Sequence, residues 1–423
     1  MNTAIAIASP PQFTLTVDQQ GAMDALCQFL CDPIETVFVL SGYSGCGKST
    51  LVRTLLDNLE GFVKTAKLIN PNQREYVVEL TATTNKAAEN LGAITGFPAS
   101  TIHSFLGLRV QTDYKTNVTT LIAKSAEVKE DYLLVIDEAS YIDSQLLKFI
   151  FSKTKNCKIV FVGDPAQLTP VKSVGTPVFN RKFTGAALTT VVRQAEGNPI
   201  VDLSTRFRQT VNTGDFFSFT PDGHHIQYLD RDAFNKAIEQ EFSRPDWRYQ
   251  DSKILAWTNK CVINFNHFVR NHVKGDPHFA VDDYAVCNSF LNINKRSIKT
   301  DQLVQITAIS PDIENMGVLG NNFTMDHMMT AFMPKTIESR NARIRQAKAD
   351  DELFRVAEID SEWVDLRAAY ACTINKAQGS TFDEVFIDLD DIRRCTSGDQ
   401  IARMLYVGVS RARNHVYLTG DLA

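Results

Sequence analysis

A glycine-rich loop between an apolar strand and an amphipathic helix is the feature that most restricts how this chain can fold. Residues 37–40 are all apolar, which predicts a buried strand, and apolar residues recur at helical spacing within 51–56. Gly42, Gly45 and Gly47 lie between these elements, where glycine lets backbone N–H groups point at phosphate oxygens. The strand, loop and helix therefore predict a phosphate-binding loop (P-loop) within an α/β unit.

The residues beside and after the last glycine suit a nucleotide bound together with Mg²⁺. Lys48 is placed to reach the β- and γ-phosphates, and the Ser49 hydroxyl to coordinate the ion. We expect ATP and Mg²⁺ as cofactors, with Thr50 completing the loop; the alternative is a chance glycine turn before a core helix. Cys46 lies at a helix N-terminus, which lowers a thiol pKa. Its alkylation should then inactivate the protein and be blocked by ATP, unless the side chain is inert filler.

Composition limits the class of protein without identifying it. The 423 residues leave room for roughly two to four domains. The net charge of −5 excludes a strongly basic molecule, so any nucleic-acid site must be local. The eight cysteines form no C-x-x-C pair, and no apolar run reaches the ~18 residues of a membrane span. We therefore expect a reduced protein of the cytoplasm that binds no membrane.

Two further strands end in side chains that suit phosphate hydrolysis. The apolar run 133–136 leads into Asp137, which can hold Mg²⁺, and Glu138, which can polarise an attacking water. A later strand, 158–163, leads to Gln167, whose neutral amide can sense a γ-phosphate or orient water. The Gly-Asp-Pro that precedes Gln167 is, taken by itself, only a turn.

Polar side chains elsewhere offer contacts to a base or to a phosphate backbone. The amide of Gln19, ahead of the P-loop strand, can both donate to and accept from an adenine edge, although a surface glutamine at a helix start fits equally well. Hydroxyls, an amide and an imidazole follow two other strands, where they suit phosphate contacts but are also typical of helix capping. They are Thr83, Thr84, Asn85, Thr101 and His103.

The hydrophobic pattern divides the chain into two α/β units and two insertions. We expect a loose N-terminal tail, a first α/β unit that contains a small hairpin, and a second α/β unit interrupted by a β-rich insertion with a polar projecting segment. The expected bounds are 1–12 for the tail, 13–185 for the first unit, about 105–125 for the hairpin, 186–275 with 366–423 for the second unit, and 276–365 for the insertion.

In this order, the motifs resemble those of superfamily 1 helicases, in particular the RecD-like, phage Dda-type branch. The resemblance covers about residue 15 to 420, with one departure: the family usually has histidine where this chain has Asn375, and an amide can donate to a phosphate but cannot titrate or stack as well. The matching segments are GYSGCGKST, VIDEAS, GDPAQLTPV, VVRQ, AWTN, TINKAQGS and LYVGVSRAR.

The resemblance implies two RecA-like motor domains, with ATP between them and single-stranded DNA across the top. The first motor would supply Lys48, Ser49, Asp137, Glu138 and Gln167, and the family pattern adds nucleotide contacts from Gln378 and Gly379. Arg193 and Arg411 would reach across as arginine fingers, which stabilise the transferring γ-phosphoryl group. The alternative is that these arginines make surface ion pairs, worth ~0–1 kcal/mol.

For DNA, the resemblance implies a track of hydroxyls and amides, an aromatic that stacks on bases, and a pin that splits the duplex. Trp257 is the stacking candidate, and a plain core tryptophan is its alternative. Tyr114 would lie near the tip of the pin, and the insertion would be an SH3-like domain that braces it. The implied track comprises Thr83, Thr84, Asn85, Thr101, His103, Val171, Trp257, Asn259, Thr373 and Asn375.

The resemblance predicts an ATP-dependent DNA helicase that moves 5′ to 3′ on single-stranded DNA. Expected partners are single-stranded and forked DNA, a single-strand binding protein and replisome components, for a monomer in the host cytoplasm of a phage. The alternatives are a P-loop kinase, an ATPase that remodels protein–DNA complexes, an ATP-gated loader, and an RNA helicase, since no residue identifies a reader of the 2′-hydroxyl.

Overall fold

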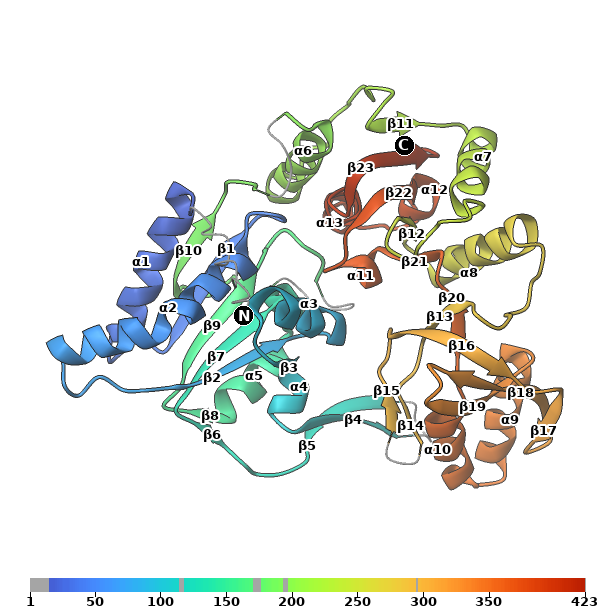
Figure 1. The fold of residues 1–423 in the computed structure, drawn as a ribbon, viewed down its shortest axis with the longest axis horizontal. Helices are drawn as coiled ribbons and strands as arrows, with labels where there is room; N and C mark the ends of the chain where they lie inside the picture. Colours follow the sequence, from blue (N-terminus) through green and yellow to red (C-terminus); the bar gives the residue numbers. More distant parts are fainter. Residues whose placement is uncertain (1–14, 114–117, 170–175, 193–196, 294–295, 423) are drawn as a thin grey trace, which may run out of the picture.

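Two parallel α/β units and an antiparallel insertion make up the computed structural model of this chain (Figure 1). It describes residues 15–113, 118–169, 176–192, 197–293 and 296–422. The expected fold class is therefore confirmed, including both insertions. The predictions for the 1–12 tail, Tyr114, Val171 and Arg193 concern residues outside these ranges.

The first unit is a six-stranded parallel sheet in the order β10-β1-β9-β7-β2-β3. Alternate residues of each strand face opposite sides, so Val135 packs with α1, α2 and α3, whereas Ile136 packs with α4 and α5. Its elements are α1 (Val17–Cys31), β1 (Val37–Gly42), α2 (Lys48–Ile69), β2 (Val77–Ala82), α3 (Asn85–Thr95), β3 (Ala99–Thr101), α4 (Ile102–Phe105), β6 (Lys129–Glu130), β7 (Tyr132–Asp137), η1 (Ala139–Tyr141), α5 (Ser144–Ser152), β8 (Thr154–Lys155), β9 (Lys158–Gly163) and β10 (Thr184–Leu188).

The predicted hairpin is present, as β4 (Leu108–Asp113) paired antiparallel with β5 (Val118–Ala123). The boundary expected at residue 185 falls inside β10, which pairs with β1 as far as Leu188. The first sheet thus extends slightly further along the chain than the change of pattern indicated.

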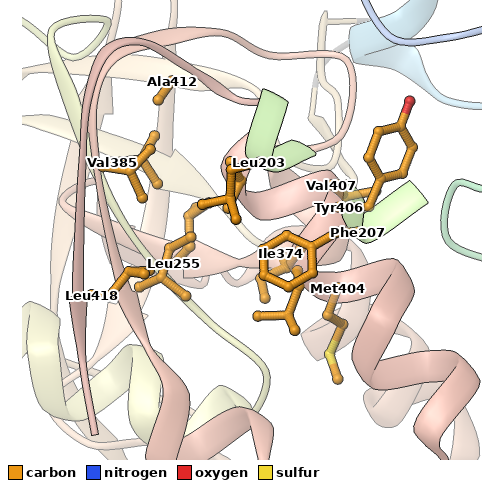
Figure 2. Close-up of a cluster of buried hydrophobic side chains, with 14 of the residues drawn as sticks. Leu203, Phe207, Leu255, Ile374, Val385, Met404, Tyr406, Val407, Ala412 and Leu418 are labelled. Atoms are coloured by element: carbon orange, nitrogen blue, oxygen red, sulfur yellow. The ribbon is translucent and has the colours of Figure 1, made fainter. Parts of the chain in front are cut away.

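The second unit is a parallel sheet in the order β11-β23-β22-β12-β21. α7 and α8 pack on one face, and α6, α11, α12 and α13 pack on the other. Figure 2 shows side chains of α6, α11 and α13 in the second of these clusters. Its elements are α6 (Pro199–Thr213), β11 (Ile226–Tyr228), α7 (Arg231–Phe242), β12 (Ser252–Ala256), α8 (Asn259–Phe268), the π-helix η2 (Val269–Val273), β21 (Ala371–Thr373), α11 (Ile374–Ala377), β22 (Phe382–Asp388), α12 (Leu389–Ile392), α13 (Gly398–Val409) and β23 (Ala412–Thr419).

The insertion is an antiparallel sheet that carries two helices. Its last strand lies past the boundary expected at 365, since β20 pairs with β13. The projecting segment, expected only to be polar, forms the helices α9 and α10. The elements are β13 (Tyr284–Cys287), β14 (Leu291–Ile293), β15 (Arg296–Ile298), β16 (Leu303–Ile309), β17 (Ile313–Asn315), β18 (Val318–Met325), β19 (Met329–Pro334), α9 (Ile337–Ala349), α10 (Leu353–Glu362) and β20 (Leu366–Ala368).

The register of the first sheet brings the functional loops to one edge. Ser41 pairs with Gly163 on the neighbouring strand, and Ala82 pairs with Asp137. The loops after β1, β2, β7 and β9 therefore begin side by side, at the carboxyl edge where parallel α/β sheets bind ligands. Among the described residues, no helix has the length and apolar character needed to cross a membrane.

Candidate nucleotide and nucleic-acid site

The P-loop has the conformation that its glycines predict. Gly45 and Gly47 have φ of 79° and 81°, in the left-handed region that favours glycine, and α2 begins at Lys48. The ammonium of Lys48 donates to the carbonyls of Gly42 and Tyr43, at 2.9 and 2.8 Å. The loop therefore curls around the lysine at the helix N-terminus, the arrangement that binds phosphate.

Gln19 is part of the wall of this loop. Its Nε2 donates to the Cys46 carbonyl at 2.9 Å, and its Oε1 accepts from the Thr16 backbone N–H at 3.0 Å. A Cβ on Gly47 would lie 2.6 Å from Gln19 Nε2, and the φ of 81° at this position already favours glycine. The structure thus places Gln19 against the P-loop, and its reading of an adenine edge stays a prediction.

Of the two interpretations of Cys46, the structure favours inert filler over a reactive thiol. The side chain is fully buried, and burial raises the thiol pKa, an effect larger than the opposing attraction of Lys48. Its Sγ fills the space beneath Gly42, where an added Cβ would lie only 2.7 Å away. Cys46 is therefore a packing residue.

Two adjacent carboxylates lie opposite the P-loop. Burial and the negative charge of Glu138 raise the pKa of Asp137 well above its usual range, and Lys48 opposes this. Asp137 accepts a hydrogen bond from the Glu138 N–H at 2.8 Å. Glu138 itself has φ of 55°, an uncommon value for a residue with a side chain and one typical of functional sites.

The second unit contributes side chains directly to this cleft. The Gln378 amide donates to the Glu138 carboxylate at 3.1 Å and to Oε1 of Gln167. Arg411 is buried and donates to the Ser44 hydroxyl of the P-loop at 3.0 Å. The structure therefore brings residues that directly follow α11 and α13 against the catalytic candidates of the first unit.

A buried network that the sequence did not reveal joins the same two units. The Tyr406 hydroxyl accepts from the Ser44 N–H at 2.9 Å and donates to Asp164, which is 0% exposed. Arg208 pairs with Asp164 at 3.2 Å and lies over the ring of Tyr43, 3.8 Å from its centroid. Figure 2 shows the Tyr406 hydroxyl directed away from the apolar cluster that holds its ring. The Gly-Asp-Pro segment is thus a docking point as well as a turn.

Most expected nucleotide and catalytic residues line one cleft, with a volume of about 440 Å³. Three of the expected residues lie next to this lining: Gln19 donates to the P-loop at Cys46, Gln378 donates to Glu138, and the Gly42 carbonyl accepts from Lys48. The lining includes Gly45, Gly47, Lys48, Ser49, Thr50, Asp137, Glu138, Gln167, Gly379 and Arg411.

A second cleft, of about 470 Å³, lies between both units and the insertion. It brings together three of the expected strand-binding residues, Asn85, Asn259 and Thr373, with Lys299 and Lys376 beside them. Its wall is shared with the nucleotide cleft, and the shared residues are Lys86, Tyr249, Gln250, Ser380 and Phe382.

The other expected strand-binding hydroxyls have local partners. Thr84 and Thr101 cap α3 and α4 by accepting backbone N–H bonds, each at 3.2 Å. Thr83 donates to the Glu138 carbonyl at 3.3 Å. These contacts fit the capping interpretation and also hold the hydroxyls at the carboxyl edge of the sheet.

Three further strand-binding candidates, Trp257, His103 and Asn375, are partly buried or bonded within the protein. Trp257 packs partly buried against the core of the second unit, and its backbone N–H donates to Asp391 at 2.8 Å. Burial lowers the pKa of His103, which favours its neutral form. The Asn375 carbonyl accepts from the Tyr141 hydroxyl at 3.2 Å, so this residue also joins the two units.

Comparison with known proteins agrees with this arrangement. Residues 14–230, slightly more than half of the chain, match a family model described as an AAA domain, and 368–419 match the UvrD-like helicase C-terminal domain. The chain is 25% identical over 451 residues to the ATP-dependent DNA helicase dda of Enterobacteria phage T4, which covers 95% of this chain and 98% of that protein. It is 33% identical over 190 residues to the ATP-dependent RecD2 DNA helicase of Deinococcus radiodurans, covering 44% and 23%.

Solved structures share the fold. A structure of two coordinating Pif1 helicases at forked double-stranded DNA aligns with a TM-score of 0.53 at 19% identity, over 97% of this chain and 93% of that one. A Bacteroides Pif1 helicase in complex with ADP-AlF3 and single-stranded DNA aligns with a TM-score of 0.52 at 17% identity, over 97% and 94%. The expectation of two RecA-like units is therefore confirmed.

Proposed function

The chain belongs to helicase superfamily 1B, and from that premise we propose that this ATP-dependent DNA helicase moves 5′ to 3′ along single-stranded DNA and separates forked duplexes. One observation carries the proposal. Catalytic candidates from both α/β units meet in one cleft, and that cleft shares a wall with a second cleft lined by the strand-binding candidates. Chemistry in the first cleft can therefore move residues of the second.

The residues of the nucleotide cleft fit ATP with Mg²⁺. Ser49 and Asp137 offer the hydroxyl and carboxylate oxygens that Mg²⁺ prefers. Burial, and after it the negative charge of Glu138, raise the Asp137 pKa, and both favour a cation beside this carboxylate. No cage of three His, Cys, Asp or Glu side chains occurs in the described ranges, which fits an ion held by few protein ligands together with phosphates. Mg²⁺ would neutralise charge on the β- and γ-phosphates during transfer.

The residues of the cleft then divide the work of hydrolysis among them. Glu138 polarises the attacking water and takes its proton, and the Gln167 amide orients the water or senses the γ-phosphate. Lys48 and Arg411 stabilise the negative charge that develops on the transferred group. Because Arg411 comes from the second unit, hydrolysis requires the two units to be docked. Arg193 would act beside it as a second finger.

The strand would lie along the second cleft. Asn85, Asn259 and Thr373 donate to phosphates without adding positive charge, which reconciles a DNA track with a net charge of −5. Trp257 would stack on a base, and the β4–β5 hairpin with Tyr114 would part the duplex. Opening and closing of the nucleotide cleft would advance the strand by a small step in each cycle. The protein would act as a monomer, together with a single-strand binding protein and the replisome.

The test compares ATP hydrolysis without polynucleotide, with single-stranded DNA and with single-stranded RNA, using Lys48→Ala as the blank. Stimulation by DNA alone supports the proposal, and forked substrates with a 5′ or a 3′ tail then give the polarity. Equal rates in all three conditions would refute it. Stimulation without strand separation would instead indicate an ATPase that remodels protein–DNA complexes.

A further inference from the structure

Gln378 makes a contact that conflicts with hydrolysis. It is 7% exposed, and its Nε2 donates to the Glu138 carboxylate at 3.1 Å, to Gln167, and at a longer 3.5 Å to the Ser140 hydroxyl. A general base must accept a proton from water with a carboxylate lone pair, and a water-orienting amide must be available to that water. One carboxylate oxygen of Glu138 and the amide oxygen of Gln167 are instead bound to Gln378.

The side-chain amide of Gln378 makes only part of its possible hydrogen bonds in this position. Its Oε1 is buried, and within the described ranges it has no hydrogen-bond partner. A buried amide carbonyl without a partner carries a desolvation cost, so the position is held by the contacts of Nε2 alone. The side chain can therefore be displaced more easily than a fully bonded one.

A single helical turn connects this contact to the strand cleft. α11 spans only Ile374–Ala377; its N-cap Thr373 lines the strand cleft, and its C-cap is Gln378. Figure 1 shows α11 on the side of the second unit that faces the first. Gly379 follows with φ of 77°, a conformation that glycine adopts without strain. A shift of α11 on one side must therefore move the Gln378 backbone on the other.

An ion pair also connects α11 to the insertion, and DNA would compete for its lysine. Lys376 Nζ pairs with the Asp301 carboxylate at 2.6 Å and also donates to Asn288 Oδ1 at 2.8 Å. Lys376 and Asp301 both line the strand cleft. A DNA phosphate carries the same kind of charge as Asp301, so a strand in the cleft competes directly for Lys376.

We propose that Gln378 is a positioning residue that holds Glu138 and Gln167 in an inactive arrangement until DNA in the strand cleft draws α11 away. The strand displaces Asp301 from Lys376, α11 shifts, and the Gln378 amide leaves Glu138, which then faces water. ATP hydrolysis thereby depends on DNA. This inference rests on the proposed function, whose nucleotide and strand sites it connects.

The test is Gln378→Met, which keeps the length of the side chain and removes its amide. A hydrogen bond to a charged group corresponds to a factor of about 10 to 100, so the ATPase rate without DNA should rise by about tenfold or more. The rate with saturating oligonucleotide should stay within a few-fold of the wild type. A basal rate that is unchanged or lower would overturn the proposal.

A matched control uses the same substitution at the same interface. Gln400 on α13 donates from Nε2 to the Thr169 hydroxyl of the first unit at 3.1 Å, away from Glu138. Gln400→Met should leave the basal rate unchanged. An equal rise in both variants would mean that any loosening of the interface activates hydrolysis, and it would refute a specific role for Gln378.

Wild-type protein supplies a second measurement that does not depend on the folding of a variant. Gln378 and Ser380 donate their backbone N–H groups to the carbonyls of Asn375 and Ala377, at 3.3 and 3.0 Å. A thymidine oligonucleotide should accelerate hydrogen exchange at these two amides, and unchanged exchange would contradict the proposal. If DNA does not raise the ATPase rate of the wild type, the proposed function itself is refuted. If DNA raises the wild-type rate but Gln378→Met leaves the basal rate unchanged, only this inference is refuted.

Discussion

Replacing Lys253 with methionine should stabilise the protein at neutral pH, and the gain should disappear at alkaline pH. Lys253 lies on β12, an inner strand of the second sheet between β22 and β21, and is 1% exposed. Its ammonium donates to the Ala369 carbonyl and lies 3.6 Å from the centroid of the Tyr249 ring. The Phe382 ring lies further away, at 5.3 Å, so the surroundings of the amine are one carbonyl and two aromatic rings. Burial of a charge with such partners is costly.

The size of the effect follows from the pKa of Lys253. Burial lowers this pKa from 10.5 to about 7. At 1.36 kcal/mol for each pKa unit, the difference corresponds to about 5 kcal/mol of destabilisation when the amine is charged. The cation–π contact with Tyr249 favours the charged form by about 1–2 kcal/mol, so we expect a net gain of ~3 kcal/mol for the methionine variant.

Whether the stability rises or falls with pH depends on which state, folded or unfolded, binds the Lys253 proton more tightly. The folded-state pKa is depressed, so between pH 7 and 10.5 the unfolded chain binds more protons and wild-type stability rises with pH. The penalty is fully present below about pH 7 and absent above 10.5. The advantage of the methionine variant should therefore be constant below pH 7 and decline toward pH 10.

The assay is urea unfolding followed by tryptophan fluorescence, with Trp247 and Trp257 reporting on the second unit. Wild type, Lys253→Met and the exposed-site control Lys260→Met are compared from pH 6 to pH 10. Only Lys253→Met should show a pH-dependent difference in unfolding free energy. A difference that stays constant across this range would refute the reasoning.

Three further variants test the nucleotide cleft. Arg411→Ala should lower the DNA-stimulated ATPase rate by about a thousandfold or more if it is an arginine finger, and a loss below tenfold in steady-state kinetics would favour the ion-pair interpretation. Tyr406→Phe removes the hydroxyl that joins Ser44 and Asp164, so the KM for ATP should rise by about tenfold, and an unchanged KM would contradict a role in docking the P-loop. N-ethylmaleimide should leave the ATPase rate intact because the Cys46 thiol is buried and its pKa is raised, and inactivation that ATP prevents would contradict this.

The elements that sequence predicted well are those encoded by short, local patterns. The P-loop needs only an apolar strand, three glycines and a helix start, all within about twenty residues, and it folds as expected. Asp137 and Glu138 follow directly from the apolar run of β7. The hairpin was equally local. Such patterns determine backbone conformation before any distant contact is made.

The local environment of a side chain was harder to predict. Position alone left Cys46 as either a reactive thiol or inert filler, since a helix N-terminus lowers a thiol pKa, and only its packing beneath Gly42 decides for the second. The helix α9 was missed for a related reason. Ala347 is its only residue that the structure buries, so its sequence lacks the apolar periodicity that predicts a helix.

The docking of the two units could not be predicted because it depends on residues more than two hundred positions apart. Ser44 receives both of its second-unit contacts from the end of α13: its N–H binds Tyr406 and its hydroxyl binds Arg411. The motif around these residues indicates a helix with basic side chains, but not which loop it meets. Since Tyr406 also binds the loop after β9 through Asp164, one helix end holds two catalytic loops of the opposite unit. We therefore expect that closure of the cleft would also align the P-loop, as coupling of hydrolysis to movement requires.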